Sequence, residues 1–279
     1  RYVRPEAIDP NIMGYSLTGT IVDIGSRVSE FSPGDMVAAL APHAQYVAVE
    51  TINVVPANQP SVIHLPSNVS AEIGTFWHLA TSAVLWMEQA AIREEDTVVI
   101  QGQGLVGSLC LQVAKLDGRA RLIAVDSLNS RLETAGRFGA DEVVDAAAKD
   151  PVEAVQRLTD GEGADIVVEA VGGRWGARAF AQAQDMIRDG GLIQIIGAHE
   201  DEPLPIDSLK IQGVRLIGGY LEQGQRPEAS EKAVKLLADG RIQAEKMITH
   251  RFPFGQADQA FDLLYNRLEE ALGVLLLWD

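Results

Sequence analysis

Three glycines between a strand-like run and a helix-like run have the spacing of a phosphate-binding turn. They are Gly102, Gly104 and Gly107, and they directly follow the apolar run 97–100. In such a turn the first glycine permits the tight bend, the second lets a pyrophosphate approach the backbone, and the third lets the helix pack closely on the sheet. Unpaired N–H groups at the helix start then hold the phosphate charge. The pattern predicts binding of a dinucleotide.

An acidic residue stands at the end of the next predicted strand. Asp126 closes the run 121–125, about 20 residues beyond the glycine turn, where a carboxylate can accept hydrogen bonds from a ribose. Its charge would repel a 2′-phosphate, so we expect NAD rather than NADP as the cofactor. Arg131 opens the following helix and could swing towards such a phosphate. It can equally pair with Asp126 or stack on the adenine.

The rest of the predicted cofactor site follows from the order of the elements. In open α/β sheets, ligands bind at the carboxyl ends of the parallel strands. We therefore expect the segments after the fourth and fifth strands to border the adenosine and nicotinamide halves, and Thr81 or Ser82 to touch the nicotinamide end. The predicted cofactor-binding residues are Gly102, Gly104, Leu105, Val106, Gly107, Asp126, Arg131, Ala170, Val171, Gly197, Ala198, Thr81 and Ser82.

Composition excludes several classes of protein. With 279 residues, 47% of them hydrophobic, the chain can bury one large core or two. A formal net charge of −16 argues against a nucleic-acid partner. The longest apolar run, 271–278, is far shorter than the roughly 20 residues of a membrane-spanning helix, so no membrane partner is expected and the cytoplasm is the default location. Arg1 cannot be a native start, so we expect a leading segment to be missing.

The chain divides into three stretches of different pattern. Residues 14–66 contain short β-branched runs separated by Gly, Pro and Asn, which predict a compact antiparallel barrel. Residues 71–92 predict helices. From residue 94 strands and helices alternate, which indicates a parallel sheet with helices on both faces. The barrel strands are expected at 17–25, 33–37 and 44–49, the parallel strands at 97–100, 122–125, 142–144, 165–169, 192–196 and 214–217, and the helices at 105–116, 129–138, 151–159 and 175–188. A helix at 231–238, a strand at 248–252, and a helix with a closing strand within 254–276 complete the prediction.

Several further motifs follow one another in a fixed order. They are Gly14-Tyr15-Ser16, Gly19-Thr20-Ile21-Val22, Phe31-Ser32-Pro33-Gly34-Asp35-Met36-Val37, His43-Ala44-Gln45-Tyr46-Val47, Phe138-Gly139-Ala140-Asp141, Gly163-Ala164-Asp165, Gly190-Gly191 and Ile248-Thr249-His250-Arg251-Phe252-Pro253. Together with the glycine turn, this order resembles the medium-chain dehydrogenase/reductase superfamily, which contains the zinc-type alcohol, sorbitol and threonine dehydrogenases and the quinone reductases. The resemblance covers nearly the whole chain.

The resemblance implies a fold of two domains. A groES-like β-barrel catalytic domain would occupy 1–93, with 223–279 returning to it, and a doubly wound Rossmann NAD-binding domain would occupy 94–222. The active site would lie in the cleft between them. The resemblance also implies a homodimer or homotetramer that joins through the last Rossmann strand, here 214–219.

The positions that ligate zinc in this superfamily carry other residues in this chain. The family's Gly-His-Glu reads Gly14-Tyr15-Ser16, and the ligand position before the Rossmann domain falls on His78. The first cysteine ligand would precede Arg1, and the four-cysteine lobe of the structural zinc is absent. Cys110 is the only cysteine of the chain. We therefore expect no metal site and no bound zinc, because one remaining ligand cannot form a tetrahedral site.

Without zinc, a side chain must handle the proton of the reaction. Hydride transfer between an alcohol and a nicotinamide releases or takes up one proton, for which a group titrating near neutrality is suited. By alignment with the metal-ligand positions, His78 is the predicted acid/base and Tyr15 the predicted hydrogen-bond partner of the substrate oxygen. His43, at the start of a predicted barrel strand, is the third catalytic candidate. The first two have structural alternatives: His78 can form a hydrogen bond with a backbone carbonyl, and Tyr15 can fill the space that the metal vacates.

Three functions remain open from the sequence. The first is a zinc-independent, NAD-dependent oxidoreductase that interconverts a secondary alcohol and its ketone, with a polyol, sugar or specialised metabolite as the small-molecule substrate. The Tyr15-Ser16 replacement and Asp126 favour it. The second is a zinc-free, NADPH-dependent quinone or enoyl reductase that acts on C=C bonds. The third is a non-catalytic dinucleotide-binding protein, which the loss of zinc ligands keeps open.

Overall fold

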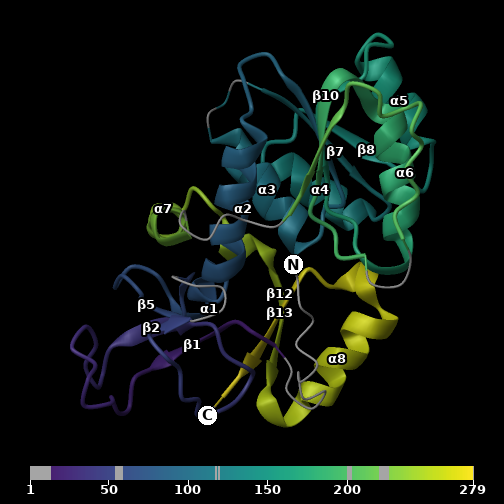
Figure 1. Cartoon of the computed structure of the whole chain (residues 1–279). Helices are drawn as coiled ribbons and strands as arrows, with labels where there is room; N and C mark the ends of the chain where they lie inside the picture. Colours follow the sequence, from purple (N-terminus) through teal and green to yellow (C-terminus); the bar gives the residue numbers. More distant parts are fainter. Residues whose placement is uncertain are drawn as a thin grey trace. The chain divides into compact units, whose positions relative to one another are not determined.

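The protein forms two compact units in the computed structural model, which describes residues 14–53, 59–116, 118, 120–199, 203–219 and 226–278 (Figure 1). The smaller unit contains the described residues up to Ser82, together with 226–240 and Trp278. The larger unit contains those from Ala83 to 219 and from Arg241 to Leu277. The predicted domains, 1–93 with 223–279 and 94–222, stay a prediction.

A six-stranded parallel sheet forms the centre of the larger unit, in the order β11-β10-β9-β6-β7-β8. Its inner strands are buried on both faces, so they read in the sequence as nearly continuous apolar runs. The predicted parallel sheet is therefore confirmed. Its strands are β6 (Thr97–Gln101), β7 (Arg121–Asp126), β8 (Glu142–Asp145), β9 (Ala164–Glu169), β10 (Ile187–Ile195) and β11 (Arg215–Gly218).

Helices connect these strands, and Figure 1 shows α5 and α6 on the opposite side of the sheet from α3. Phe180 and Met186 of α6 are fully buried in the core that this helix forms with α5 and the sheet. The helices are α3 (Leu105–Lys115), α4 (Asn129–Arg137), α5 (Pro151–Leu158) and α6 (Gly176–Met186), with a short 3₁₀ turn, η1 (Gly173–Trp175). None of the described helices is long and apolar enough to cross a membrane.

The last part of the larger unit contains the strand, helix and closing strand that the sequence predicted for this stretch. Two strands pair in parallel, and the helix between them packs on both. The elements are η3 (Ala244–Met247), β12 (Ile248–Pro253), η4 (Phe254–Gln256), α8 (Ala257–Asn266), η5 (Leu268–Glu270) and β13 (Gly273–Leu277).

The smaller unit is an antiparallel sheet with helices packed on it. Its three longer strands pair in the order β1-β2-β5, and two short strands, β3 and β4, pair separately. Thr18 ties the sheet to the first helix, because its hydroxyl donates to the Ala71 carbonyl at 2.9 Å. The elements are β1 (Leu17–Thr20), β2 (Met36–Ala39), β3 (Ile52–Asn53), β4 (Gln59–Pro60), β5 (Val62–His64), α1 (Ala71–Gly74), α7 (Arg226–Ala238) and the first part of α2 (Trp77–Ala90), which belongs to the larger unit from Ala83 onwards.

Two predictions for this unit need correction. The expected strand at 44–49 does not form, because none of the described strands pairs with this segment, and Tyr46 remains 73% exposed. His43 therefore lies in a loop rather than at the start of a strand. The helix expected at 231–238 begins earlier, at Arg226, where Pro227 in the first turn is compatible with a helix start.

Candidate active site

The glycine turn after β6 leaves one stretch of backbone open to a ligand. Gly102 has a φ of +90°, and a Cβ added there would lie 2.8 Å from the Val171 side chain. A Cβ at Gly107 would overlap the Gly102 carbonyl oxygen. At Gly104, by contrast, the nearest atom to an added Cβ is Arg131 Nη1, at 3.9 Å. Gly102 and Gly107 therefore shape the turn, whereas Gly104 leaves space beside the backbone.

Helix α3 starts from this turn without a side-chain cap. Its N-cap residue is Gly104, which has no side chain to satisfy the first N–H groups. Gly104, Leu105 and Val106 are partly exposed, whereas Gln103 and Gly107 are buried. The first N–H groups of a helix lack partners inside it and carry partial positive charge. This helix start therefore fits an anionic phosphate group.

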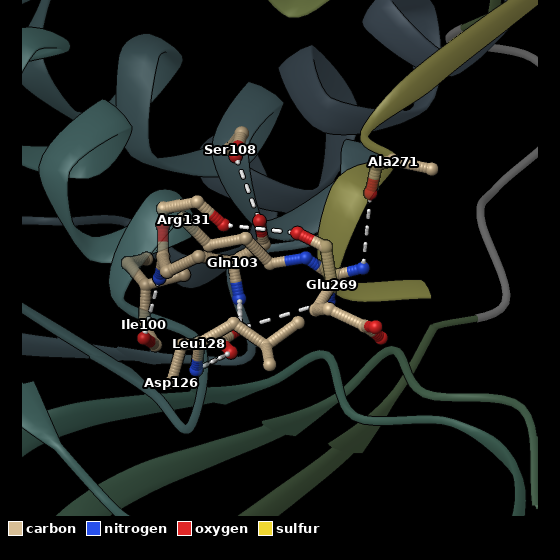
Figure 2. Close-up of polar contacts among 9 residues, drawn as sticks. Ile100, Gln103, Ser108, Asp126, Leu128, Arg131, Glu269 and Ala271 are labelled. Carbon is tan, nitrogen blue, oxygen red and sulfur yellow. Dashed lines mark hydrogen bonds and ion pairs between the residues drawn. The ribbon is translucent and has the colours of Figure 1, made fainter. Parts of the chain in front are cut away.

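Asp126 ends β7 beside the glycine turn, and its carboxylate accepts two backbone N–H groups (Figure 2). Oδ2 accepts from the Gln103 N–H at 2.6 Å, and Oδ1 accepts from the Leu128 N–H at 2.9 Å. The side chain is only 6% exposed. Because a carboxylate has about four acceptor positions, each oxygen keeps one for a ribose hydroxyl.

Arg131 lies next to Asp126 in the same cluster. Its Nη1 is 3.9 Å from Asp126 Oδ2, and its Nη2 donates to the Ala271 carbonyl at 3.5 Å. Its Nε is buried without a hydrogen-bond partner. Of the arrangements that the sequence left open for Arg131, the structure contains the pairing with Asp126.

The segments that follow β9 and β10 meet at the carboxyl edge of the sheet. The Gly173 N–H donates to the Ala198 carbonyl at 3.0 Å, and the Gly197 N–H donates to the Glu169 carbonyl at 3.0 Å. A Cβ added at Gly197 would lie 2.5 Å from the Val171 carbonyl oxygen. The structure thus brings together Ala170, Val171, Gly197 and Ala198, and the contact of Gly102 with Val171 joins them to the glycine turn. Cofactor binding by these residues stays a prediction.

A buried acid–imidazole pair supports this edge. Glu169 Oε1 accepts from the Val171 N–H at 2.7 Å, and Glu169 Oε2 lies 2.9 Å from His199 Nε2. Burial raises the pKa of Glu169 to about 8 and lowers the pKa of His199. At neutral pH the Glu169 carboxyl therefore keeps its proton, and it shares a hydrogen bond with the His199 ring. The pair connects the loop after β9 to the loop after β10.

In the smaller unit, two of the three predicted catalytic residues lie in contact. The rings of Tyr15 and His78 meet edge to face, with centroids 5.5 Å apart. Burial, together with the charge of Arg226, lowers the pKa of His78 to about 4, so the imidazole is neutral at neutral pH. Tyr15 remains 53% exposed. His43 packs on the backbone of Gly14, directly before Tyr15, and partial burial lowers its pKa.

Thr81 and Ser82 form their hydrogen bonds within the smaller unit. The Thr81 hydroxyl donates to the Trp77 carbonyl at 2.8 Å. The Ser82 hydroxyl donates to the His78 carbonyl at 3.3 Å and accepts from Arg226 Nη2 at 3.4 Å. Both residues are buried, and their predicted contact with the nicotinamide stays a prediction.

The side chains around His78 do not fit a zinc ion. Within the described part of the chain, no group of three or more His, Cys, Asp or Glu residues could hold a metal ion. Ser16, at a ligand position of the superfamily, instead donates its hydroxyl proton to the Thr75 carbonyl. Among the described residues, the charge that acts on His78 is the cation of Arg226, which would repel Zn²⁺. The expected absence of zinc stays a prediction.

The parallel sheet, the glycine turn and the acid at the end of β7 are typical of a dinucleotide-binding protein of the α/β class. Comparison with known proteins agrees. The family described as zinc-binding dehydrogenase matches residues 106–239. The zinc-type alcohol dehydrogenase-like protein YdjJ of Escherichia coli is 28% identical, over 97% of this chain and 84% of its own. The sorbitol dehydrogenase of Halalkalibacterium halodurans is 27% identical, over 96% of this chain and 83% of its own.

A solved structure of an alcohol dehydrogenase is also similar to this protein. The alcohol dehydrogenase TADH from Thermus sp. ATN1 matches with a TM-score of 0.77 and 26% identity, over 96% of this chain and 84% of its own. The chain is therefore an oxidoreductase with a Rossmann domain and a groES-like domain, and it is similar to the zinc-type alcohol dehydrogenases of the medium-chain dehydrogenase/reductase superfamily.

Three residues of these sites did not emerge from the sequence. Glu169 had a local signal, because it is a charged residue that ends an apolar strand next to the predicted Ala170. His199 and Arg226 had none, because their partners, Glu169 and Ser82, are far away in the sequence.

Replacing Gly104 by Val should weaken cofactor binding without affecting the stability of the fold. The added side chain enters space that is open in the protein but that a pyrophosphate would need, so we expect NAD affinity to fall about tenfold or more with little change in melting temperature. Gly107→Ala is the contrasting variant, because its Cβ overlaps the Gly102 carbonyl and should lower the melting temperature. Calorimetric titration and thermal unfolding measure both effects. Unchanged NAD affinity in Gly104→Val would defeat the assignment.

Glu169 should make stability depend on pH. The folded protein keeps the Glu169 proton up to about pH 8, whereas the unfolded chain releases it near the ordinary glutamate pKa of 4.5. Between these values the folded state binds the extra proton, so the free energy of unfolding falls as pH rises. In Glu169→Gln the free energy of unfolding should fall less steeply with pH, by at most about 1.4 kcal/mol per pH unit. Urea unfolding across this range tests it, with the exposed Glu162→Gln as control. Equal slopes in wild type and Glu169→Gln would contradict the assignment.

Proposed function

We propose that this oxidoreductase interconverts a secondary alcohol and its ketone by hydride transfer, with NAD as the cofactor and without zinc. Relatives named sorbitol dehydrogenase and D-arabitol-phosphate dehydrogenase support an alcohol as the substrate. The bound nicotinamide would accept or supply the hydride. The observation that carries the proposal is the uncapped helix start at Gly104 beside the Asp126 carboxylate.

NAD is favoured over NADP by the position of Asp126. Its carboxylate is fixed by the N–H groups of Gln103 and Leu128, so it cannot turn away from a ribose that binds next to it. Two like charges about 4 Å apart repel each other by roughly 1 kcal/mol in water and by more in a partly buried site. A 2′-phosphate at this place would therefore be disfavoured.

The residues around His78 suit proton transfer without a metal. Because the pKa of His78 is about 4, its imidazole is unprotonated at neutral pH and can accept the hydroxyl proton of an alcohol. Partial burial raises the pKa of Tyr15, so its phenol keeps a proton that it can donate to the substrate oxygen. In this proposal His78 is the base, Tyr15 orients the oxygen, and His43 borders them on the side of Gly14.

A zinc-free, NADPH-dependent quinone or enoyl reductase is the second candidate. The observation in its favour is Arg131, whose buried Nε has no partner among the described residues and whose guanidinium could bind a 2′-phosphate. The pairing of Arg131 with Asp126 weakens this reading, since the carboxylate already balances its charge.

We also propose that the protein forms a homodimer or homotetramer through β11. This strand lies at the edge of the sheet in the described part of the chain, so the main-chain groups of its outer side are available to a second copy.

The proposal predicts alcohol oxidation that needs His78 and no metal. After dialysis against a chelator, the protein should still oxidise secondary alcohols with NAD, and His78→Asn should lower kcat by about 10²- to 10⁴-fold. The control is His64→Asn, an exposed histidine of the same unit. The rate should stay level across neutral pH and fall only as the pH approaches the His78 pKa of about 4, where the base becomes protonated.

Other outcomes of this assay would decide against the proposal. Activity that is lost on chelation and restored by Zn²⁺ would show a metal enzyme. Reduction of conjugated C=C bonds with NADPH, without alcohol oxidation, would support the second candidate. Tight NAD binding without turnover of any alcohol would indicate a non-catalytic binding protein.

A further inference from the structure

The side chain of Arg226 is a buried cation that has no counter-charge among the described residues. Arg226 is 7% exposed, and its Nη2 lies 3.4 Å from the Ser82 hydroxyl. Its Nε is buried and has no hydrogen-bond partner in the part of the chain that the structure describes. Within the described part of the chain no carboxylate pairs with it, and burial lowers its pKa. A buried charge of this kind is costly unless a partner of opposite sign is supplied.

The position of Arg226 in its helix adds to the positive potential. It is the first residue of α7, where the helix dipole already places partial positive charge. Glu228, the acidic residue of the first turn, is exposed and does not pair with it. A hydrogen bond from Trp77 Nε1 to the Ser230 hydroxyl, at 2.7 Å and buried, fixes α7 against α2. The start of the helix that carries Arg226 is therefore held against α2.

Arg226 acts on the residues to which we assign proton transfer. Ser82, which it contacts, lies one helical turn after His78, and the Ser82 hydroxyl donates to the His78 carbonyl. The charge of Arg226 also lowers the pKa of His78. Tyr15 contacts the ring of His78. A group that reaches Arg226 is thus close to the proposed acid/base.

We propose that Arg226 binds an oxyanion carried by the substrate, so that the substrates are secondary alcohols bearing a phosphate or a carboxylate. This inference rests on the proposed function and names its substrate class. A planar guanidinium can donate two parallel hydrogen bonds to either anion, and the orphaned Nε supplies one of these donors. Binding also has a consequence for catalysis. By neutralising Arg226, the anion raises the pKa of His78 and makes it a stronger base when substrate is present.

Thermal unfolding tests the anion site without any turnover. Wild type, Arg226→Met and the control Arg27→Met, an exposed arginine of the same unit, are each melted with added phosphate, acetate or chloride at equal ionic strength. Saturating NAD is present throughout, so that the helix start at Gly104 is occupied. We expect phosphate or acetate to raise the melting temperature of wild type and Arg27→Met by on the order of 2–4 °C relative to chloride. The anion that raises the melting temperature more, phosphate or acetate, indicates which group the substrate carries. Arg226→Met should lose this response.

The chloride samples provide a second readout. Because Arg226→Met removes an unpaired buried charge, it should melt at or above the wild-type temperature, whereas loss of a purely structural contact would lower it. The inference is overturned if Arg226→Met responds to phosphate and acetate as wild type does, or if wild type responds to neither.

Kinetics separates this inference from the proposed function. For an anionic alcohol and its neutral parent, the wild-type ratio of kcat/KM should favour the anionic compound, and Arg226→Met should reduce that ratio at least about tenfold. If both compounds are turned over and Arg226→Met leaves their kcat/KM ratio unchanged, the proposed substrate class is wrong but the proposed function stands. If phosphate stabilises wild type but not Arg226→Met, and wild type turns over no alcohol, the anion site stands and the proposed function is wrong.

Discussion

The Asp126 carboxylate fixes the two loops on which the dinucleotide site depends. It accepts the Gln103 N–H of the glycine turn and the Leu128 N–H of the loop before α4, so the ends of β6 and β7 share one acceptor. Each of these N–H groups would cost about 1–3 kcal/mol if it were buried without a partner. The same hydrogen bonds keep the carboxylate next to the open backbone at Gly104, where we expect the cofactor. One side chain thus has both a structural role and the predicted role in choosing between NAD and NADP.

The parallel sheet and the glycine turn could be predicted from the sequence because their signals are local. Strands such as β6 and β7 are buried on both faces and read as apolar runs, and the turn residues follow one of them directly. The strand predicted at 44–49 had a similar local pattern, but a strand also needs a pairing partner, which a local pattern does not show. The same limit applies to His199 and Arg226, whose roles depend on contacts with Glu169 and Ser82 that the fold creates.

The two units create different electrostatic environments. At the edge of the parallel sheet, Asp126 is balanced by Arg131 and by backbone N–H groups, and burial keeps Glu169 protonated. In the smaller unit, His78 is neutral and Arg226 is a cation without a described acid beside it. A buried cation at this place is poorly suited to a neighbouring zinc ion and well suited to an anionic group. The proposed chemistry follows from this difference, with a neutral base for the proton and a buried cation for the substrate.

The most direct test of this account is a titration of NAD and NADP against wild type and Asp126→Ser, with the melting temperature of each protein measured alongside. Wild type should bind NAD about tenfold or more tightly than NADP, because the carboxylate accepts the ribose hydroxyls and repels a 2′-phosphate. Asp126→Ser should lose most of this preference, through weaker NAD binding and stronger NADP binding. Tighter NADP binding by wild type, or an unchanged preference in a folded Asp126→Ser, would contradict the account.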